Sequence, residues 1–185
     1  RKDIPLQLMI GVLAEEQPRI FENDRFGFNR YRGKNSFVFE SCEYMDNFLS
    51  FCPNLAVILN IEFDHGDYFA DINAVRLSFR KYAQLSLSSG GRVLINGDDA
   101  STAAAVDGLE CVRFGLGKNC DYRGEDIKVE NGNPSFTLVC PDGEKYSISL
   151  PVPGEHNVYN ALAAWAAAAA NGISQRDIIR GLASL

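Results

Sequence analysis

The sequence lacks the features that mark membrane, secreted and nucleic-acid-binding proteins. It has no apolar run of the roughly 18 residues that a membrane span requires. It also has no positively charged start that leads into an apolar signal segment. The formal net charge is −6 and no block of basic residues is present. We therefore expect neither nucleic acid nor an anionic membrane surface as a partner.

Cysteine usage argues against a disulfide framework and against a structural zinc site. The chain has five cysteines, an odd number, and no two of them form a C-x-x-C pair. They are Cys42, Cys52, Cys111, Cys120 and Cys140. This usage is typical of reduced thiols, so the sequence predicts a cytoplasmic protein.

Length and periodicity predict a single α/β domain. A chain of 185 residues suits one domain with a sizeable core. Leu55–Leu59 is an apolar run typical of a strand buried on both faces, and we expect it inside a mainly parallel sheet rather than at its edge. Between Asp71 and Leu87 the apolar residues recur at helical spacing, which predicts an amphipathic helix on the sheet. Arg92–Ile95 is the next predicted strand.

The pattern changes in the second half of the chain. Tyr122–Val129, Ser135–Cys140 and Tyr146–Leu150 are strand-like runs joined by turn signals, which predicts a small antiparallel sheet appended to the parallel one. A helix is predicted from His156 to Ala170. A last helix, from Ser174 to about Ala183, begins with a capping-box-like sequence.

Polar side chains gather directly after the Leu55–Leu59 strand. They are Asn60, Glu62, Asp64, His65 and Asp67. Ligands of open α/β sheets bind just beyond the carboxyl ends of the strands, and carboxylates with an imidazole can hold a divalent cation or move a proton. The alternative is a polar turn that caps the next helix, with Asp67 or Asp71 as the cap. A second acidic cluster, Asn96–Asp99, is better interpreted as a turn and helix N-cap.

Three stretches together resemble the Mur ligases, the ATP-dependent amide-forming enzymes of peptidoglycan assembly. Asn60–Phe69 resembles the family's Asn-x-x-x-Asp-His signature, and Gly154–Leu162 resembles its Gly-x-His-Asn-x-x-Asn adenine-binding motif. Phe39–Leu49 resembles the branch that adds L-alanine to UDP-N-acetylmuramate. The stretches occur in the family order, and the only two histidines of the sequence, His65 and His156, both fall inside them.

The resemblance implies a fold, two cofactors and two substrates. The fold is the P-loop NTPase-like central domain of a Mur ligase, a mainly parallel sheet flanked by helices with a small appended antiparallel sheet. The intact enzyme would use ATP and Mg²⁺ to phosphorylate the lactyl carboxylate of UDP-N-acetylmuramate. The amine of L-alanine would then attack the acyl phosphate, release phosphate and form the amide.

The resemblance also nominates site residues. Glu40 aligns with the family's magnesium-binding glutamate and His65 with the histidine at the second magnesium site, so both are predicted to be metal-binding and catalytic. Asn157 and Asn160 align with residues that hydrogen-bond adenine, and His156 lies beside them with its role open. Each has a structural alternative. Glu40 could cap a strand end, His65 could bond a backbone carbonyl, and asparagines also cap helices.

The family's phosphate loop is missing from the sequence. No G-x-x-x-x-G-K-S/T occurs anywhere in it, and the uridine-nucleotide and carboxy-terminal domains of the family are absent too. We therefore expect residues 1–185 to be a Mur ligase central-domain fragment that lacks the phosphate loop. Two alternatives remain. One is the related recycling ligase, which attaches a peptide to the same sugar nucleotide, and the other is a non-catalytic nucleotide-fold remnant.

We predict that this chain alone folds, is inactive as a ligase and binds ATP no more tightly than about millimolar. Most of the binding energy in such folds comes from backbone N–H groups and a lysine on the phosphates. Asn157 and Asn160 add a few hydrogen bonds of about 0.5–1.5 kcal/mol each, against an association cost of at least roughly 4 kcal/mol. Calorimetric titration of ATP and Mg²⁺ into the purified chain measures this affinity, and micromolar binding would contradict the prediction.

Overall fold

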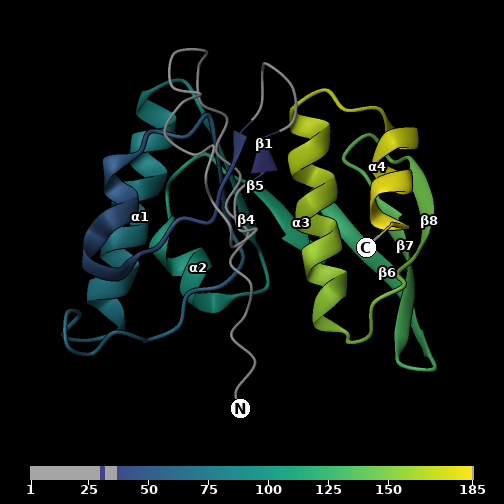
Figure 1. Cartoon of the computed structure of the whole chain (residues 1–185), viewed down its shortest axis with the longest axis horizontal. Coiled ribbons are helices and arrows are strands. Elements are labelled where there is room, and N and C mark those ends of the chain that lie inside the picture. Colours follow the sequence, from purple (N-terminus) through teal and green to yellow (C-terminus); the bar gives the residue numbers. More distant parts are fainter. Residues whose placement is uncertain (1–29, 32–36, 185) are drawn as a thin grey trace.

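The computed structural model describes residues 30–31 and 37–184 of the chain, arranged as an α/β sandwich (Figure 1). Two short strands, β1 (Arg30–Tyr31) and β2 (Phe37–Val38), pair antiparallel in a sheet of their own. Glu40 follows β2 and its side chain is exposed. Among the described residues, no helix is long and apolar enough to cross a membrane.

Six further strands form one continuous sheet in the order β3-β4-β5-β6-β7-β8. They are β3 (Leu55–Ile58), β4 (Arg92–Asn96), β5 (Val112–Gly115), β6 (Tyr122–Glu130), β7 (Asn133–Val139) and β8 (Lys145–Ser149). The strands from β3 to β6 are parallel, and β7 and β8 are added antiparallel. The predicted fold class is confirmed, and the predicted hairpins continue the parallel sheet because β6 pairs with β5.

The helices cover both faces of this sheet. They are the 3₁₀ helix η1 (Tyr44–Ser50) and the α-helices α1 (Ile72–Ser88), α2 (Ala100–Ala105), α3 (His156–Ala170) and α4 (Gln175–Leu182). Figure 1 shows α1 and α2 on one side of the parallel strands and α3 on the other. The predicted starts of α1 and α4 are confirmed. Asp71 and Ser174 cap these helices by accepting hydrogen bonds from backbone N–H groups.

The predicted internal position of the Leu55–Leu59 strand stays a prediction. Among the described residues β3 pairs with β4 alone. All four of its residues are nevertheless buried. Leu55 and Val57 face the α3 side, whereas Ala56 and Ile58 face the α1 side. A continuous apolar run therefore indicates that helices pack on both faces of the strand. It does not indicate whether a second strand pairs with the strand's other edge.

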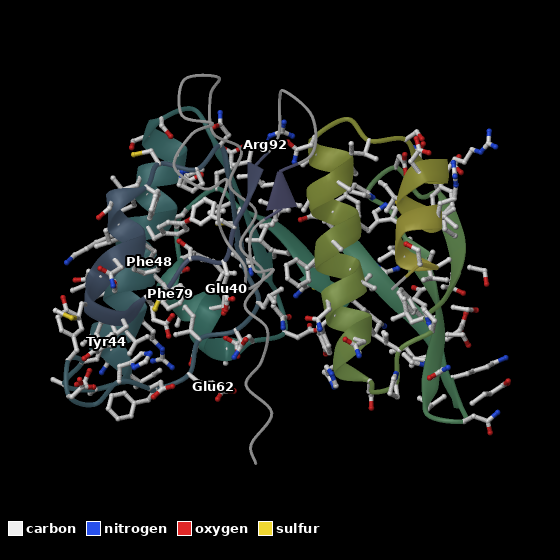
Figure 2. The ribbon with its side chains drawn as sticks, viewed as in Figure 1. Glu40, Tyr44, Phe48, Glu62, Phe79 and Arg92 are labelled. Atoms are coloured by element: carbon white, nitrogen blue, oxygen red, sulfur yellow. The ribbon has the colours of Figure 1, made fainter. Side chains whose placement is uncertain are left out.

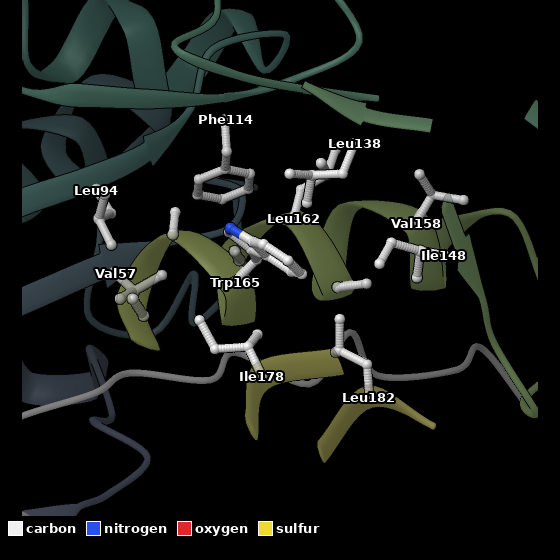
Figure 3. Close-up of a cluster of buried hydrophobic side chains, with 14 of the residues drawn as sticks. Val57, Leu94, Phe114, Leu138, Ile148, Val158, Leu162, Trp165, Ile178 and Leu182 are labelled. Carbon is white, nitrogen blue, oxygen red and sulfur yellow. The ribbon is translucent and has the colours of Figure 1, made fainter. Parts of the chain in front are cut away.

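Trp165 lies at the centre of the core on the α3 side (Figure 3). It is 1% exposed and its ring lies 4.8 Å from that of Tyr146, measured between centroids. Phe114 of β5 and Ile178 of α4 belong to the same cluster. A single aromatic side chain thus ties α3 both to the sheet and to the last helix.

We predict that Trp165→Ala lowers the free energy of unfolding by about 3–5 kcal/mol, because a fully buried aromatic side chain is replaced by a cavity. Urea denaturation followed by far-ultraviolet circular dichroism measures the change, since Trp165 is the only tryptophan and its fluorescence would be lost. Leu77→Ala is the control. Leu77 is on α1 and 54% exposed, so its loss should cost no more than about 0.5 kcal/mol. Similar losses in the two variants would contradict this view of the core.

Candidate functional site

His65 follows β3, one of the parallel strands that end at one edge of the sheet. Because β3, β4 and β5 are parallel, the loops after them leave from the same edge, which we call the carboxyl edge. Figure 2 shows Tyr44 and Glu62 near one end of the molecule and Arg92, at the start of β4, near the other. The last residues of α3 lie beside Leu55 and Arg92. The first turn of α3 therefore points to the carboxyl edge, where open α/β sheets bind ligands.

His65 sits in the loop after β3 and is held by contacts from the segment around η1. Its Nε2 lies 3.6 Å from Oε1 of Glu43, and its ring lies 4.5 Å from the ring of Tyr44. Its backbone has a φ of 55°, and its carbonyl accepts hydrogen bonds from the N–H groups of Tyr68 and Phe69. A left-handed conformation is uncommon for residues other than glycine, although histidine adopts it more often than most, and the imidazole faces Glu43.

Two tyrosine–aspartate hydrogen bonds fasten this loop to the segment around η1. Tyr44 donates from its hydroxyl to Oδ2 of Asp67 at 2.5 Å, and Tyr68 donates to Oδ2 of Asp46 at 2.8 Å. The first bond stabilises the carboxylate, so it lowers the pKa of Asp67 and raises the pKa of Tyr44. Ser78 of α1 also donates to Asp46. The pair of bonds, which we call the tyrosine clasp, fixes the position of His65.

The structure brings Glu43, rather than Glu40, to His65. Glu40 is exposed and makes no hydrogen bond or ion pair with the described residues. Over residues 38–184, no three or more His, Cys, Asp or Glu side chains are grouped closely enough to hold a metal ion. Mg²⁺, however, commonly takes only one or two carboxylates and completes its shell with water and phosphate. An exposed carboxylate with no partner among the described residues fits that role, and the imidazole of His65 faces the carboxylate of Glu43.

The predicted adenine-binding residues come together in the first turn of α3. Asn157 donates from Nδ2 to the carbonyl oxygen of Pro153 at 2.8 Å, and Asn160 donates from Nδ2 to Oδ1 of Asn157 at 3.0 Å. His156 is exposed at the start of the helix. Gly154 has a φ of 105°, and a Cβ atom there would lie only 2.5 Å from the His156 ring. The glycine of the motif is therefore favoured by its backbone conformation, which L side chains rarely adopt.

Sequence reasoning missed the role of Asp98. Of the Asn96–Asp99 cluster, Asp99 is the helix cap, accepting from the N–H of Thr102 at 2.7 Å. Asp98 instead accepts from the backbone N–H groups of Leu116 at 2.5 Å and Gly117 at 3.0 Å, in the loop after β5. A helix start needs one capping carboxylate. Because Asp99 already caps α2, the presence of a second aspartate, Asp98, was the sequence signal that this carboxylate bonds a different segment.

Two cavities lie away from these residues. With volumes of about 160 and 220 Å³, they are at the opposite edge of the sheet, where α3 ends. Leu55, Arg92 and Ala170 line both of them, and none of the predicted site residues lines either. These two cavities are therefore separate from the candidate site at the carboxyl edge.

The chain is similar to proteins of one family. Residues 23–168 match the Mur ligase middle domain. UDP-N-acetylmuramate–L-alanine ligase of Acetivibrio thermocellus is 42% identical over 93% of this chain, and that of Clostridium novyi is 36% identical over 88%. The alignments cover 36% and 34% of those two relatives, so the chain spans about a third of their length.

Solved structures show the same fold. The UDP-N-acetylmuramate–alanine ligase of Thermotoga maritima superposes with a TM-score of 0.68 and 25% identity, covering 83% of this chain and 34% of that one. MurF of Acinetobacter baumannii superposes with a TM-score of 0.62 and 29% identity, covering 75% of this chain and 31% of that one.

We predict that Tyr44→Phe raises the pKa of Asp67 back towards its ordinary value of 3.8, because the hydrogen bond that stabilises the carboxylate is lost. Carbon-detected NMR titration of the aspartate carboxyl groups measures this. In the parent chain the bond stabilises the fold above the ordinary pKa, and that contribution disappears as the pH falls through the lowered pKa.

Tyr68→Phe is the matched control for this titration. It removes the other hydroxyl of the tyrosine clasp, which bonds Asp46 rather than Asp67. The pKa of Asp67 should stay low in this variant. Equal pKa values of Asp67 in Tyr44→Phe and in the parent chain would show that the hydroxyl does not set it.

Proposed function

The chain belongs to the Mur ligase family, whose middle domain it matches, and from this we propose that it is the ATP-binding domain of a ligase that joins L-alanine to UDP-N-acetylmuramate. The observation that carries the proposal is the agreement between relatives and motifs. Relatives named for that reaction are 36–42% identical over most of the chain, and two of the nominated motifs, the loop of His65 after β3 and the first turn of α3, lie at one edge of the sheet. The reaction belongs to the intact protein.

The proposed reaction needs a group that activates a carboxylate. A carboxylate is a poor electrophile, so its oxygen must first become a leaving group, and the γ-phosphate of ATP supplies it. Catalysis then depends mainly on positioning and on neutralising the charge of the phosphates. The sequence has no phosphate loop, so the proposal requires that the intact protein supplies one outside residues 1–185.

The first turn of α3 would bind the adenine. Asparagine amides offer both a donor and an acceptor, which matches the ring nitrogen and amino group on one edge of adenine. Asn157 and Asn160 are held by their own hydrogen bonds, so little ordering remains when the base arrives. His156 is exposed next to them, where it would border the nucleotide.

Glu40 and His65 would serve the metal and phosphate end of the nucleotide. Glu40 would hold Mg²⁺ through its exposed carboxylate, and His65, fixed by Glu43, would lie at a second magnesium position. Bound Mg²⁺ would neutralise the negative charge that develops on the transferred phosphoryl group. The tyrosine clasp would keep the imidazole in place while the substrates exchange.

We predict that Glu40→Gln in the intact ligase lowers kcat by about 100- to 1,000-fold, because an isosteric amide removes the charge that attracts the cation. The measurement is phosphate release with ATP, UDP-N-acetylmuramate and L-alanine across a magnesium titration. Glu110→Gln is the matched control. Glu110 is exposed and precedes β5, so it lies at the opposite edge of the sheet, and its variant should keep the parent rate. A near-normal rate for Glu40→Gln would eliminate the proposed role.

A further inference from the structure

Asp98 joins three elements at the carboxyl edge. It follows β4, and its own N–H is held by Oδ1 of Asn96 at 3.0 Å. Its carboxylate accepts from two successive backbone N–H groups after β5, those of Leu116 and Gly117. Successive N–H groups of this kind form a concave anion-binding site, and here the anion is a side chain of the protein itself.

The same carboxylate reaches α3. Tyr159 donates from its hydroxyl to Oδ2 of Asp98 at 3.3 Å. Tyr159 lies in the first turn of α3 between Asn157 and Asn160, the two residues proposed to bind adenine. Burial, followed by the charge of Asp98, raises the pKa of Tyr159, so its hydroxyl stays protonated and remains a donor.

The loop after β5 can approach Asp98 only because of its glycines. A Cβ atom at Gly115 would lie 2.6 Å from Oδ2 of Asp98, and one at Gly117 would lie 2.5 Å from Oδ1. Both distances are shorter than any stable contact between carbon and oxygen. Glycines at positions 115 and 117 therefore allow the backbone N–H groups of Leu116 and Gly117 to reach the Asp98 carboxylate.

We propose that Asp98, acting through Tyr159, is a positioning residue that fixes the first turn of α3 against the loop after β5 and so holds Asn157 and Asn160 where adenine binds. This role rests on the proposed function. Asp98 does not touch the base itself. It links β4, the β5–β6 loop and α3 through hydrogen bonds to one charged group, and such bonds are stronger than those between neutral groups.

The test compares Tyr159→Phe and Asp98→Asn in the intact ligase. Tyr159→Phe should raise the KM for ATP by about 3- to 10-fold, and Asp98→Asn by about 10- to 100-fold because bonds to a charged acceptor are lost. In both variants kcat and the KM for L-alanine should stay near the parent values. The double variant should resemble Asp98→Asn alone, because Tyr159 acts through Asp98.

Two reference variants make the outcome decisive. Tyr146→Phe removes a hydroxyl from a tyrosine that also packs on α3. Among the described residues this hydroxyl makes no hydrogen bond to the carboxyl edge, so the KM for ATP should not change in this variant. Asn160→Ala reports on the adenine site itself. If Asn160→Ala raises the KM for ATP and the Asp98 and Tyr159 variants do not, the positioning role is refuted. If Asn160→Ala also leaves it unchanged, the proposed adenine site is refuted and this role with it.

Discussion

The packing of α3 against the parallel strands determines where the residues of the candidate site lie. Trp165 and its neighbours bury one side of the helix in the core, and the parallel pairing of β3, β4 and β5 sends the loops after these strands to one edge. The helix ends beside the strand starts, so its first turn must lie at the other edge. The loops after β3 and β4 and the first turn of α3, which are far apart in sequence, therefore lie at the same edge of the sheet.

Carboxylates organise that edge. Asp46 and Asp67 accept from tyrosine hydroxyls, Asp98 accepts from two backbone N–H groups, and Asp99 bonds Thr102 at the start of α2. The chain also carries a net charge of −6. Such an edge repels phosphate unless a cation or additional N–H donors offset its charge. This is the electrostatic reason why the proposed function requires both Mg²⁺ and a phosphate loop from elsewhere in the protein.

Local patterns predicted the helices, the strands and the class of fold. Asp71 and Ser174 are caps because a short side-chain acceptor satisfies free N–H groups at a helix start, and this is a local property. The contacts of Glu43 and Asp98 could not be predicted. Each contact joins two segments that are about 20 residues apart in the sequence. Hydrophobic periodicity gives no information on which distant segments come into contact.

Hydrogen exchange of the intact protein, with and without a non-hydrolysable ATP analogue and Mg²⁺, tests most directly whether the carboxyl edge is the nucleotide site. Bound nucleotide should slow amide exchange in residues 60–69, 115–118 and 154–160. Residues 88–92 and 170–172, at the opposite edge beside the two cavities, should exchange as before. Protection confined to that opposite edge, at a saturating concentration of the analogue, would contradict the account.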